Sequence, residues 1–211
     1  MKIVRPSVEL INPPEYKTLL STIEQAGRTC YKSEASIKDG SAEKFIRGII
    51  KRGHESVLEH GSVTARIVCD RGVSHELVRH RLASYSQTST RYCNYANKRF
   101  GSEIEFVAPW WYDDESIPDE AATVWRFAML DAEDAYMQLI DEMGMRPEAA
   151  RAVLPNSLKT EVVMTANIRE WRHFFKLRTA PAAHPDMQIV ANLLFAEMAT
   201  KYPVLFEDIK A

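Results

Sequence analysis

The chain has 211 residues, a length typical of one compact domain, so we expect residues 1–211 to form a single domain. Hydrophobic residues make up 45% and charged residues 27% of the sequence, which excludes a disordered chain, a collagen-like repeat and a small disulfide scaffold. The formal net charge of −2 excludes a broad polyanion-binding surface, so any anion site must be a local cluster.

The sequence shows no sign of export or of a membrane anchor. It contains no run of about 18 uncharged apolar residues, and residues 1–6 lack the apolar stretch and cleavage site of a signal peptide. Cys30, Cys69 and Cys93 are an odd number of cysteines without a CxxC pair, which favours reduced thiols. We therefore expect a cytoplasmic protein with no membrane partner.

The first half of the chain shows helical and strand-like patterns in turn. Apolar residues recur every three or four positions after Ser41, which predicts one buried helix face, and they alternate with polar residues before Asp70, which predicts a half-buried strand. Proline and glycine supply most of the boundaries. The expected elements are a strand over 4–11, a helix from Pro13 to about Gly27, a loop over 31–40, a helix over 41–53, a strand over 62–70 and a helix over 72–81.

One long amphipathic helix dominates the second half. It is predicted over 119–143 because apolar residues recur there at helical spacing, namely Ala121, Trp125, Ala128, Ala132, Tyr136, Leu139 and Met143. The other expected elements are a strand over 104–108, a short helix from Pro147, a strand over 161–167 and helices over 169–178 and 185–202. Because strands and helices mix without regular alternation, we expect an α+β fold with an antiparallel or mixed central sheet flanked by helices.

A basic segment rich in hydroxyls and tyrosines runs from Arg71 to Arg99. Six basic residues against one acidic residue give it a charge of +5, which leaves −7 for the rest of a chain whose net charge is −2. Arginine binds phosphate oxygens in pairs, and neighbouring hydroxyls complete such a shell, so the segment is expected to hold phosphates. Its cations are Arg71, Arg79, Arg81, Arg91, Lys98 and Arg99, and its hydroxyls are Ser84, Ser86, Thr88, Ser89 and Thr90.

Two other interpretations stay open at this point. The same segment is compatible with a single-stranded nucleic-acid-binding module in which Tyr85, Tyr92 and Tyr95 stack on bases. The net charge of −2 argues against that module, because non-specific binders usually carry a broad basic surface. The third interpretation is an interaction protein that oligomerises through the helix over 119–143, a role that is compatible with catalysis.

Three further features carry polar chemistry. Residues 54–60 contain His and Glu, but their order is not HExxH; hydrogen bonding at a helix end is the favoured interpretation, and no metal site is expected. Arg151 stands among apolar residues, where an unpaired charge needs an internal carboxylate or an anionic ligand. Arg169 and His173 are four residues apart, so they should share one helix face.

Four ordered blocks of sequence resemble the flavin-dependent thymidylate synthase family. The hallmark of that family is Arg-His-Arg, seven residues and Ser, which here is Arg79-His80-Arg81 followed by Ser89. The other blocks occur in the order that the family has. They are Gly53-His54-Glu55-Ser56 with Glu59-His60, Arg151-Ala152-Val153-Leu154-Pro155, and Asn167-Ile168-Arg169 leading to Leu177-Arg178, so the resemblance spans about residues 45–200.

The resemblance implies an enzyme that makes dTMP from dUMP, with methylenetetrahydrofolate as the carbon donor and FAD, reduced by NADPH, as the hydride carrier. It also implies a homotetramer whose active sites are shared between subunits. For FAD it assigns Ser56, Glu59, Arg79, His80, Arg81, Asn167, Arg169 and His173. For dUMP it assigns Glu76, Arg79, Gln87, Ser89, Thr90, Arg91, Arg151 and Arg178.

Two of these residues are expected to act in catalysis. Arg178 matches an arginine that lies against the pyrimidine, where a guanidinium would stabilise negative charge on the uracil carbonyl and make C5 more nucleophilic. Ser89 is expected to position the nucleotide rather than to attack it, because no histidine is adjacent in sequence to act as its base. Cys93 is favoured as a small structural thiol over a nucleophile.

Three positions depart from the pattern of the family. Glu76 stands where glutamine is common, Ser86-Gln87 replaces a frequent Asn-Glu, and His173 replaces a common asparagine. These departures bear on individual contacts with the ligands rather than on the resemblance as a whole.

Overall fold

The computed structural model describes residues 1–97, 101 and 103–210, and the chain forms two compact units. Unit 1 comprises Met1–Ser7, Ile67–Val78 and Ser86–Val162, and unit 2 comprises Val8–Arg66, Arg79–Tyr85 and Val163–Ala211. Each unit is therefore assembled from three segments that are far apart in the sequence. The single domain over residues 1–211 stays a prediction.

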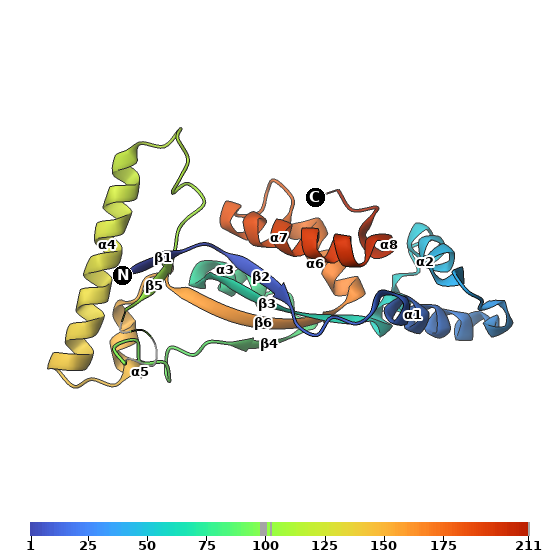
Figure 1. The fold of residues 1–211 in the computed structure, drawn as a ribbon, viewed down its shortest axis with the longest axis horizontal. Coiled ribbons are helices and arrows are strands. Elements are labelled where there is room, and N and C mark those ends of the chain that lie inside the picture. The colour runs from blue at the N-terminus through green and yellow to red at the C-terminus, as the bar shows by residue number, and fades with distance from the viewer. Residues whose placement is uncertain (98–100, 102, 211) are drawn as a thin grey trace. The chain divides into compact units, whose positions relative to one another are not determined.

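The strands form two sheets (Figure 1). In unit 1, β1 (Lys2–Val4) and β5 (Glu105–Val107) pair in parallel, with Ile3 opposite Phe106. The second sheet is antiparallel, and its strand order is β2-β3-β6-β4. Its strands are β2 (Ser7–Leu10), β3 (Ser62–Asp70), β6 (Lys159–Asn167) and β4 (Ala83–Gln87). Together with the helices, these sheets confirm the predicted α+β fold.

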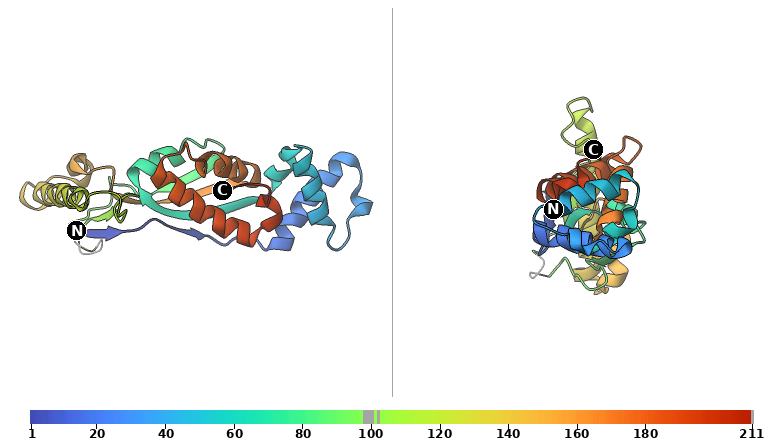
Figure 2. Two further views of the ribbon diagram at one scale, coloured as in Figure 1. Left: turned by 90° about the horizontal axis from the view of Figure 1, so that it is seen from above. Right: turned by 90° about the vertical axis from the view of Figure 1, so that its right-hand side faces the viewer.

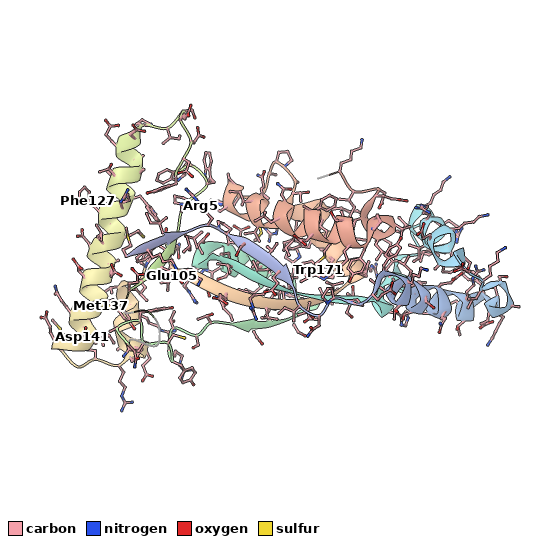
Figure 3. The ribbon with its side chains drawn as sticks, viewed as in Figure 1. Arg5, Glu105, Phe127, Met137, Asp141 and Trp171 are labelled. Carbon is pink, nitrogen blue, oxygen red and sulfur yellow. The ribbon has the colours of Figure 1, made fainter. Side chains whose placement is uncertain are left out.

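In unit 2, helix α6 packs on strand β3 and beside helix α7. The indole Nε1 of the buried Trp171 (labelled in Figure 3) donates to the carbonyl oxygen of Val63 at 3.0 Å, and α7 runs along α6 in Figure 2. The rings of Phe175 on α6 and Phe195 on α7 are 5.3 Å apart. The helices of unit 2 are α1 (Tyr16–Tyr31), α2 (Ser41–Lys51), α6 (Ile168–Arg178), α7 (Pro185–Lys201) and α8 (Pro203–Phe206), with 3-10 turns at Glu34–Ser36 and Glu55–His60.

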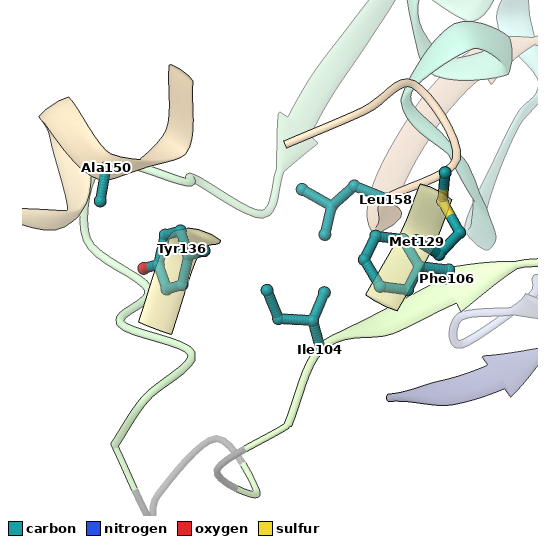
Figure 4. Close-up of a cluster of buried hydrophobic side chains, with 6 residues drawn as sticks. All are labelled: Ile104, Phe106, Met129, Tyr136, Ala150 and Leu158. Atoms are coloured by element: carbon teal, nitrogen blue, oxygen red, sulfur yellow. The ribbon is translucent and has the colours of Figure 1, made fainter. Parts of the chain in front are cut away.

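Unit 1 has its own apolar core against the long helix α4 (Asp119–Met137). Met129 and Tyr136 of α4 meet Ile104, Phe106 and Leu158 there (Figure 4). The remaining helical segments of the unit are α3 (Arg71–Leu77), a π turn at Gln138–Glu142, α5 (Pro147–Ala150) and a 3-10 turn at Arg151–Val153. Helix α4 confirms the predicted amphipathic helix. Within the described ranges, no helix is both long and apolar enough to cross a membrane.

Two boundaries near the amino terminus were predicted wrongly. The strand over 4–11 is divided into β1 and β2, because Pro6 has no N–H group to donate to a sheet ladder. The first helix continues through Gly27 to Tyr31. Gly27 is a packing residue rather than a helix end, since a Cβ at this position would lie 2.5 Å from the ring of Phe45.

The Arg79-His80-Arg81 motif is not helical, contrary to the helix predicted over 72–81. Helix α3 ends at Leu77, and the motif lies in the connection to β4, a strand that the sequence analysis missed. The signal for β4 is a short alternation in which Ser84 and Ser86 are exposed and their neighbours are half-buried. The connection lets His80 turn inward while Arg79 and Arg81 stay exposed.

Candidate functional site

The predicted ligand residues are distributed over the two units. All the residues assigned to FAD belong to unit 2, and so does Arg178. The other residues assigned to dUMP form what we call the unit 1 cluster: Glu76, Gln87, Ser89, Thr90, Arg91 and Arg151. The unit 2 cluster consists of Ser56, Glu59, Arg79, His80, Arg81, Asn167, Arg169, His173 and Arg178.

In unit 1, the amide of Gln87 is fixed by two donated hydrogen bonds. Its Nε2 donates to Ser74 Oγ at 2.9 Å and to Thr160 Oγ1 at 3.1 Å, and Ser74 Oγ donates in turn to the carbonyl oxygen of Arg71 at 2.8 Å. Because the amide nitrogen is used in this way, the acceptor Oε1 is the polar atom that Gln87 has left for a ligand. A glutamate carboxylate at this position could make neither donation.

Ser89 begins a turn directly after β4. Its carbonyl oxygen accepts from the backbone N–H groups of Tyr92 at 3.2 Å and Cys93 at 3.0 Å, and its Oγ accepts from the backbone N–H of Arg91 at 3.3 Å. The hydroxyl proton of Ser89 is therefore still available for donation to a ligand. The guanidinium of Arg91 is exposed, with its carbon 5.4 Å from the centre of the Tyr92 ring.

Arg151 is oriented by a hydroxyl rather than by a carboxylate. Its Nη1 donates to Oγ1 of the buried Thr90 at 3.1 Å, while the arginine itself is exposed. The guanidinium reaches water, so Arg151 does not carry a buried charge, and the anionic ligand that the sequence offered as its partner stays a prediction. An exposed, oriented guanidinium with hydroxyls beside it suits a phosphate. Glu76 of this cluster is half-exposed on α3.

His80 is the buried centre of the unit 2 cluster, with 4% of its surface exposed. Its Nδ1 lies 3.0 Å from Oε1 of Glu170, which is 6% exposed, and its Nε2 lies 3.0 Å from Nε of Arg178. A guanidinium nitrogen can only donate, so Nε2 of His80 carries a lone pair and the ring proton sits on Nδ1. Burial lowers the pKa of His80 and so favours the neutral ring. The hydrogen bond to Glu170 acts in the opposite direction, but its effect on the pKa is smaller.

Neighbouring residues fix the positions of His80 and Glu170. The Tyr85 hydroxyl donates to the carbonyl oxygen of His80 at 2.7 Å, and burial raises the pKa of Tyr85 to about 12, so it stays a donor. The ring of Phe174 meets the imidazole edge-on with centres 4.9 Å apart. Asn167 begins α6 as its N-cap, since its Oδ1 accepts from the Glu170 N–H at 2.9 Å. This cap sets Glu170 one turn into the helix.

The exposed part of the unit 2 cluster is cationic. Arg79 and Arg81 are exposed beside the buried His80, and Nη1 of Arg169 is held 2.6 Å from Oε1 of Glu59. Arg169 and His173 are both exposed on α6, as the spacing of four residues predicted. Ser56 is exposed in the 3-10 turn Glu55–His60.

One trio of side chains brings potential metal ligands together. Ligand atoms of His80, Glu170 and His173 lie within 4.8 Å of one another. Both nitrogens of His80 are nevertheless engaged, Nδ1 as donor to Glu170 and Nε2 as acceptor from Arg178. A metal ion would have to break one of these bonds, so the trio is better described as a hydrogen-bonded network. In the 54–60 segment, His54 Nδ1 lies 3.0 Å from the Tyr31 hydroxyl.

The three tyrosines of the basic segment do not form a stacking surface. Tyr92 is 75% exposed, but the Tyr85 hydroxyl is bound to the His80 main chain and Tyr95 packs against Tyr136 with ring centres 5.7 Å apart. Two of the cations that the nucleic-acid interpretation invokes, Lys98 and Arg99, lie outside the described residues. The nucleic-acid-binding alternative is not supported.

Cys93 is half-exposed and lies in carboxylate-rich surroundings. It lines a cavity of unit 1 together with Glu103, Glu105 and Glu161, and the charged residue of opposite sign there is Lys159. The expectation that Cys93 is a structural thiol rather than a nucleophile stays a prediction.

Comparisons with known proteins identify the family. The family described as "Thymidylate synthase complementing protein" matches residues 15–204. Flavin-dependent thymidylate synthases from Pyrococcus furiosus, Geobacter sulfurreducens and Mycobacterium tuberculosis are 36%, 35% and 37% identical over 92%, 89% and 88% of this chain, and the matches cover 79%, 81% and 78% of their lengths. The chain belongs to the flavin-dependent thymidylate synthase family.

A solved structure supports the same assignment. The crystal structure of the UMP/dUMP methylase PolB from Streptomyces cacaoi, bound with 5-Br dUMP, superimposes with a TM-score of 0.80 and 26% identity, covering 98% of this chain and 96% of that chain. Membership of the flavin-dependent thymidylate synthases confirms the predicted resemblance, the enzyme class and FAD as the cofactor.

Glu170 was not predicted as a site residue from the sequence, and Tyr85 was considered only for base stacking rather than for its hydrogen bond to His80. Glu170 could have been found from its spacing, because a glutamate three residues after an asparagine N-cap lies at a defined place in the first helical turn. Its contact with His80, 90 residues away in the sequence, has no local signal.

Proposed function

We propose that the protein converts dUMP to dTMP, with methylenetetrahydrofolate as the carbon donor and NADPH as the reductant. FAD, once reduced by NADPH, supplies the hydride. The observation that carries the proposal is that the motif residues of this chain lie in two groups, one with hydroxyls and arginines in unit 1 and one with guanidiniums and a buried histidine in unit 2. A phosphorylated pyrimidine and a dinucleotide need such a pair of sites.

For the nucleotide, we assign the unit 1 cluster to dUMP. Arg91 and Arg151 would bind the phosphate, and the Ser89 hydroxyl would donate to a phosphate or sugar oxygen. Oε1 of Gln87 would accept a hydrogen bond from the nucleotide. The remaining members assigned to dUMP are Glu76 and Thr90, and from unit 2 Arg79 and Arg178. Ser89 acts here as a positioning group.

For the cofactor, the other members of the unit 2 cluster would hold FAD. Arg79, Arg81 and Arg169 would neutralise its pyrophosphate, and Glu59 orients Arg169 for this task. Asn167 uses its side-chain oxygen as the helix cap, which leaves its amide nitrogen as a donor. His80 contributes a buried, neutral imidazole, and Ser56 and His173 are exposed polar groups of the same unit.

Arg178 is the residue that we assign to activation of the substrate. Because His80 accepts from its Nε, the plane of the guanidinium is fixed. A uracil carbonyl oxygen against this plane would have its developing negative charge stabilised by a preorganised cation, which makes C5 more nucleophilic. The arrangement lowers the barrier through orientation and charge, without a covalent bond to the protein.

We further propose a cytoplasmic homotetramer whose subunits are single functional domains over residues 1–211 and share active sites. In support, Val124 and Phe127 of α4 are 68% and 63% exposed (Phe127 is labelled in Figure 3), and Leu130 continues the same spacing of three residues. An exposed apolar helix face is typical of a subunit contact. The cysteines of the described chain are all free, which suits a reducing compartment.

Release of tritium from dUMP labelled at C5 tests the proposed function, because methylation replaces the C5 hydrogen. We expect release that requires methylenetetrahydrofolate, NADPH and FAD together, and a yellow protein whose flavin absorbance is bleached by NADPH in the absence of oxygen. A protein that neither takes up added FAD nor releases tritium would overturn the proposal.

A further inference from the structure

We infer that Glu170 is a positioning residue: its carboxylate fixes the proton of His80 on Nδ1, and the resulting lone pair on Nε2 fixes the guanidinium of Arg178. The three side chains form one series of hydrogen bonds, with 3.0 Å from Glu170 Oε1 to His80 Nδ1 and 3.0 Å from His80 Nε2 to Arg178 Nε. The role of Arg178 toward dUMP rests on the proposed function, whereas the hydrogen bonds among the three side chains do not.

The role of Glu170 depends on which ring nitrogen of His80 carries the proton. With the proton on Nδ1, the ring donates to Glu170 and accepts from Arg178, so both contacts are hydrogen bonds. With the proton on Nε2, two donors would face each other at the Arg178 contact, and a lone pair would face the carboxylate. Both contacts would then be repulsive in a buried setting, where an unsatisfied polar group is costly.

Glu170 is therefore the group that selects the tautomer. An imidazole in water favours neither nitrogen strongly, and the selection comes from the hydrogen bond at the opposite nitrogen. Glu170 is placed for this by Asn167, the N-cap of α6, whose Oδ1 accepts from the Glu170 N–H. A glutamate at this helical position commonly bonds back to the N-cap main chain. Here its carboxylate Oε1 is instead 3.0 Å from the ring of His80.

A second buried carboxylate in unit 2 provides a matched control. Glu24 is 2% exposed and bonds directly to a cation, with Oε1 2.9 Å from Nη2 of Arg28, and its Oε2 accepts from Ser41 Oγ at 2.8 Å. Its partners are not members of the unit 2 cluster. Loss of Glu24 should therefore cost stability alone, whereas loss of Glu170 should also change the proton on His80 and the hold on Arg178.

The first experiment measures the tautomer directly. Nitrogen-15 NMR of the full chain labelled in its histidines distinguishes a protonated from a lone-pair nitrogen at each ring position, and His80→Gln assigns the signals. We expect His80 to carry its proton on Nδ1 in the wild type and in Glu170→Gln, whose amide oxygen still accepts. We expect the proton to move partly or fully to Nε2 in Glu170→Ala, and the signals of His80 to be unchanged in Glu24→Ala.

The second experiment measures the effect on the substrate. We expect Glu170→Ala to raise the KM for dUMP about tenfold, the usual effect of losing one hydrogen bond to a charged group, and Glu170→Gln to stay within about threefold. Glu24→Ala should lower the melting temperature without changing this KM. Should Glu170→Ala fail to fold, Glu170→Asp keeps the charge but withdraws the carboxylate by one methylene, and the same direction of change is expected.

The outcomes separate the two claims. A wild-type His80 with its proton on Nε2, or a Glu170→Ala variant that matches Glu24→Ala in both the tautomer and the KM, would overturn the positioning role. A wild-type protein that shows the expected tautomer but neither binds dUMP nor turns it over would overturn the proposed function and leave the hydrogen-bond series in place.

Discussion

The two units hold their candidate ligand groups in different ways. In unit 1, the exposed guanidinium of Arg151 is oriented by a hydrogen bond to an uncharged group, the hydroxyl of Thr90. In unit 2, a buried carboxylate and a buried imidazole hold the guanidinium of Arg178. In unit 1, ligand binding would be the sum of several contacts with exposed groups. In unit 2, the position of Arg178 depends on each hydrogen bond of a buried series.

Single substitutions should therefore have unequal effects in the two units. Contacts of exposed charged groups are typically worth ~0–1 kcal/mol each, so the loss of one in unit 1 leaves the others in place. A buried network behaves cooperatively, because removal of one member leaves the next one unsatisfied at a cost of ~1–3 kcal/mol. We therefore expect the effects of substitution to fall from the buried series of unit 2 to the surface contacts of unit 1.

The largest effect is expected for Arg178→Ala. Removal of a preorganised charge-stabilising group typically lowers kcat by about 10²- to 10³-fold, and tritium release from C5-labelled dUMP measures this rate. Arg178→Lys keeps the charge but loses the fixed plane, so it should recover only a small part of the rate. A rate for Arg178→Ala within about threefold of the wild type would show that Arg178 does not act on the pyrimidine.

The next largest effect is expected for Arg81→Ala, an exposed cation of unit 2. Loss of one charged contact to the pyrophosphate should raise the Kd for FAD about tenfold, which absorbance of the protein during titration with FAD measures. Arg66→Ala is the matched control, because Arg66 is an exposed arginine of the same unit that pairs with Glu9. Equal flavin binding in Arg81→Ala and Arg66→Ala would place the phosphate anchor elsewhere.

A pH profile should report the charge state of His80. The groups that face it are Glu170, Arg178 and His173 from α6 and Tyr85 from β4. Burial sets the pKa of His80 below its ordinary value of 6.5, so the neutral ring should persist above that pH. As the pH falls below the folded-state pKa, protonation of Nε2 should release Arg178 and raise the KM for dUMP.

The free energy of unfolding should also decrease as the pH falls. A group with a lowered folded-state pKa contributes fully above its unfolded pKa, and this contribution decreases as the pH falls below about 6.5, because the unfolded chain then binds more protons. Melting temperatures and dUMP KM values between pH 8 and pH 5 measure both effects. If the KM for dUMP already rises while the pH is lowered from 8 to 6.5, the lowered pKa of His80 is contradicted.

The smallest effect is expected for Gln87→Glu in unit 1. The substitution removes the two hydrogen bonds donated to Ser74 and Thr160, and it should cost ~1 kcal/mol of stability and raise the KM for dUMP about threefold. Gln25→Glu is the control, since Gln25 is exposed on α1 and its side-chain amide donates to Ser21. An unchanged KM in a destabilised Gln87→Glu variant would assign Gln87 to the fold rather than to the nucleotide.

The sequence by itself determined the features that depend on neighbouring residues. The spacing of apolar residues was sufficient for α4 and for the strand at 62–70, and the spacing of four residues placed Arg169 and His173 on one face of α6. The four ordered blocks that include Arg79-His80-Arg81 were sufficient for the family. These features follow from local backbone geometry and side-chain pattern, which repeat within a few residues.

The tertiary structure alone decided how the motif residues are used. Only the fold shows that His80 is buried while Arg79 and Arg81 are exposed, that Glu170 lies 90 residues away at its ring, and that the amide of Gln87 bonds to Ser74 and Thr160. The physical reason is that burial and long-range hydrogen bonds arise when distant segments close on one another, and no pattern within a single segment encodes which partner it will meet.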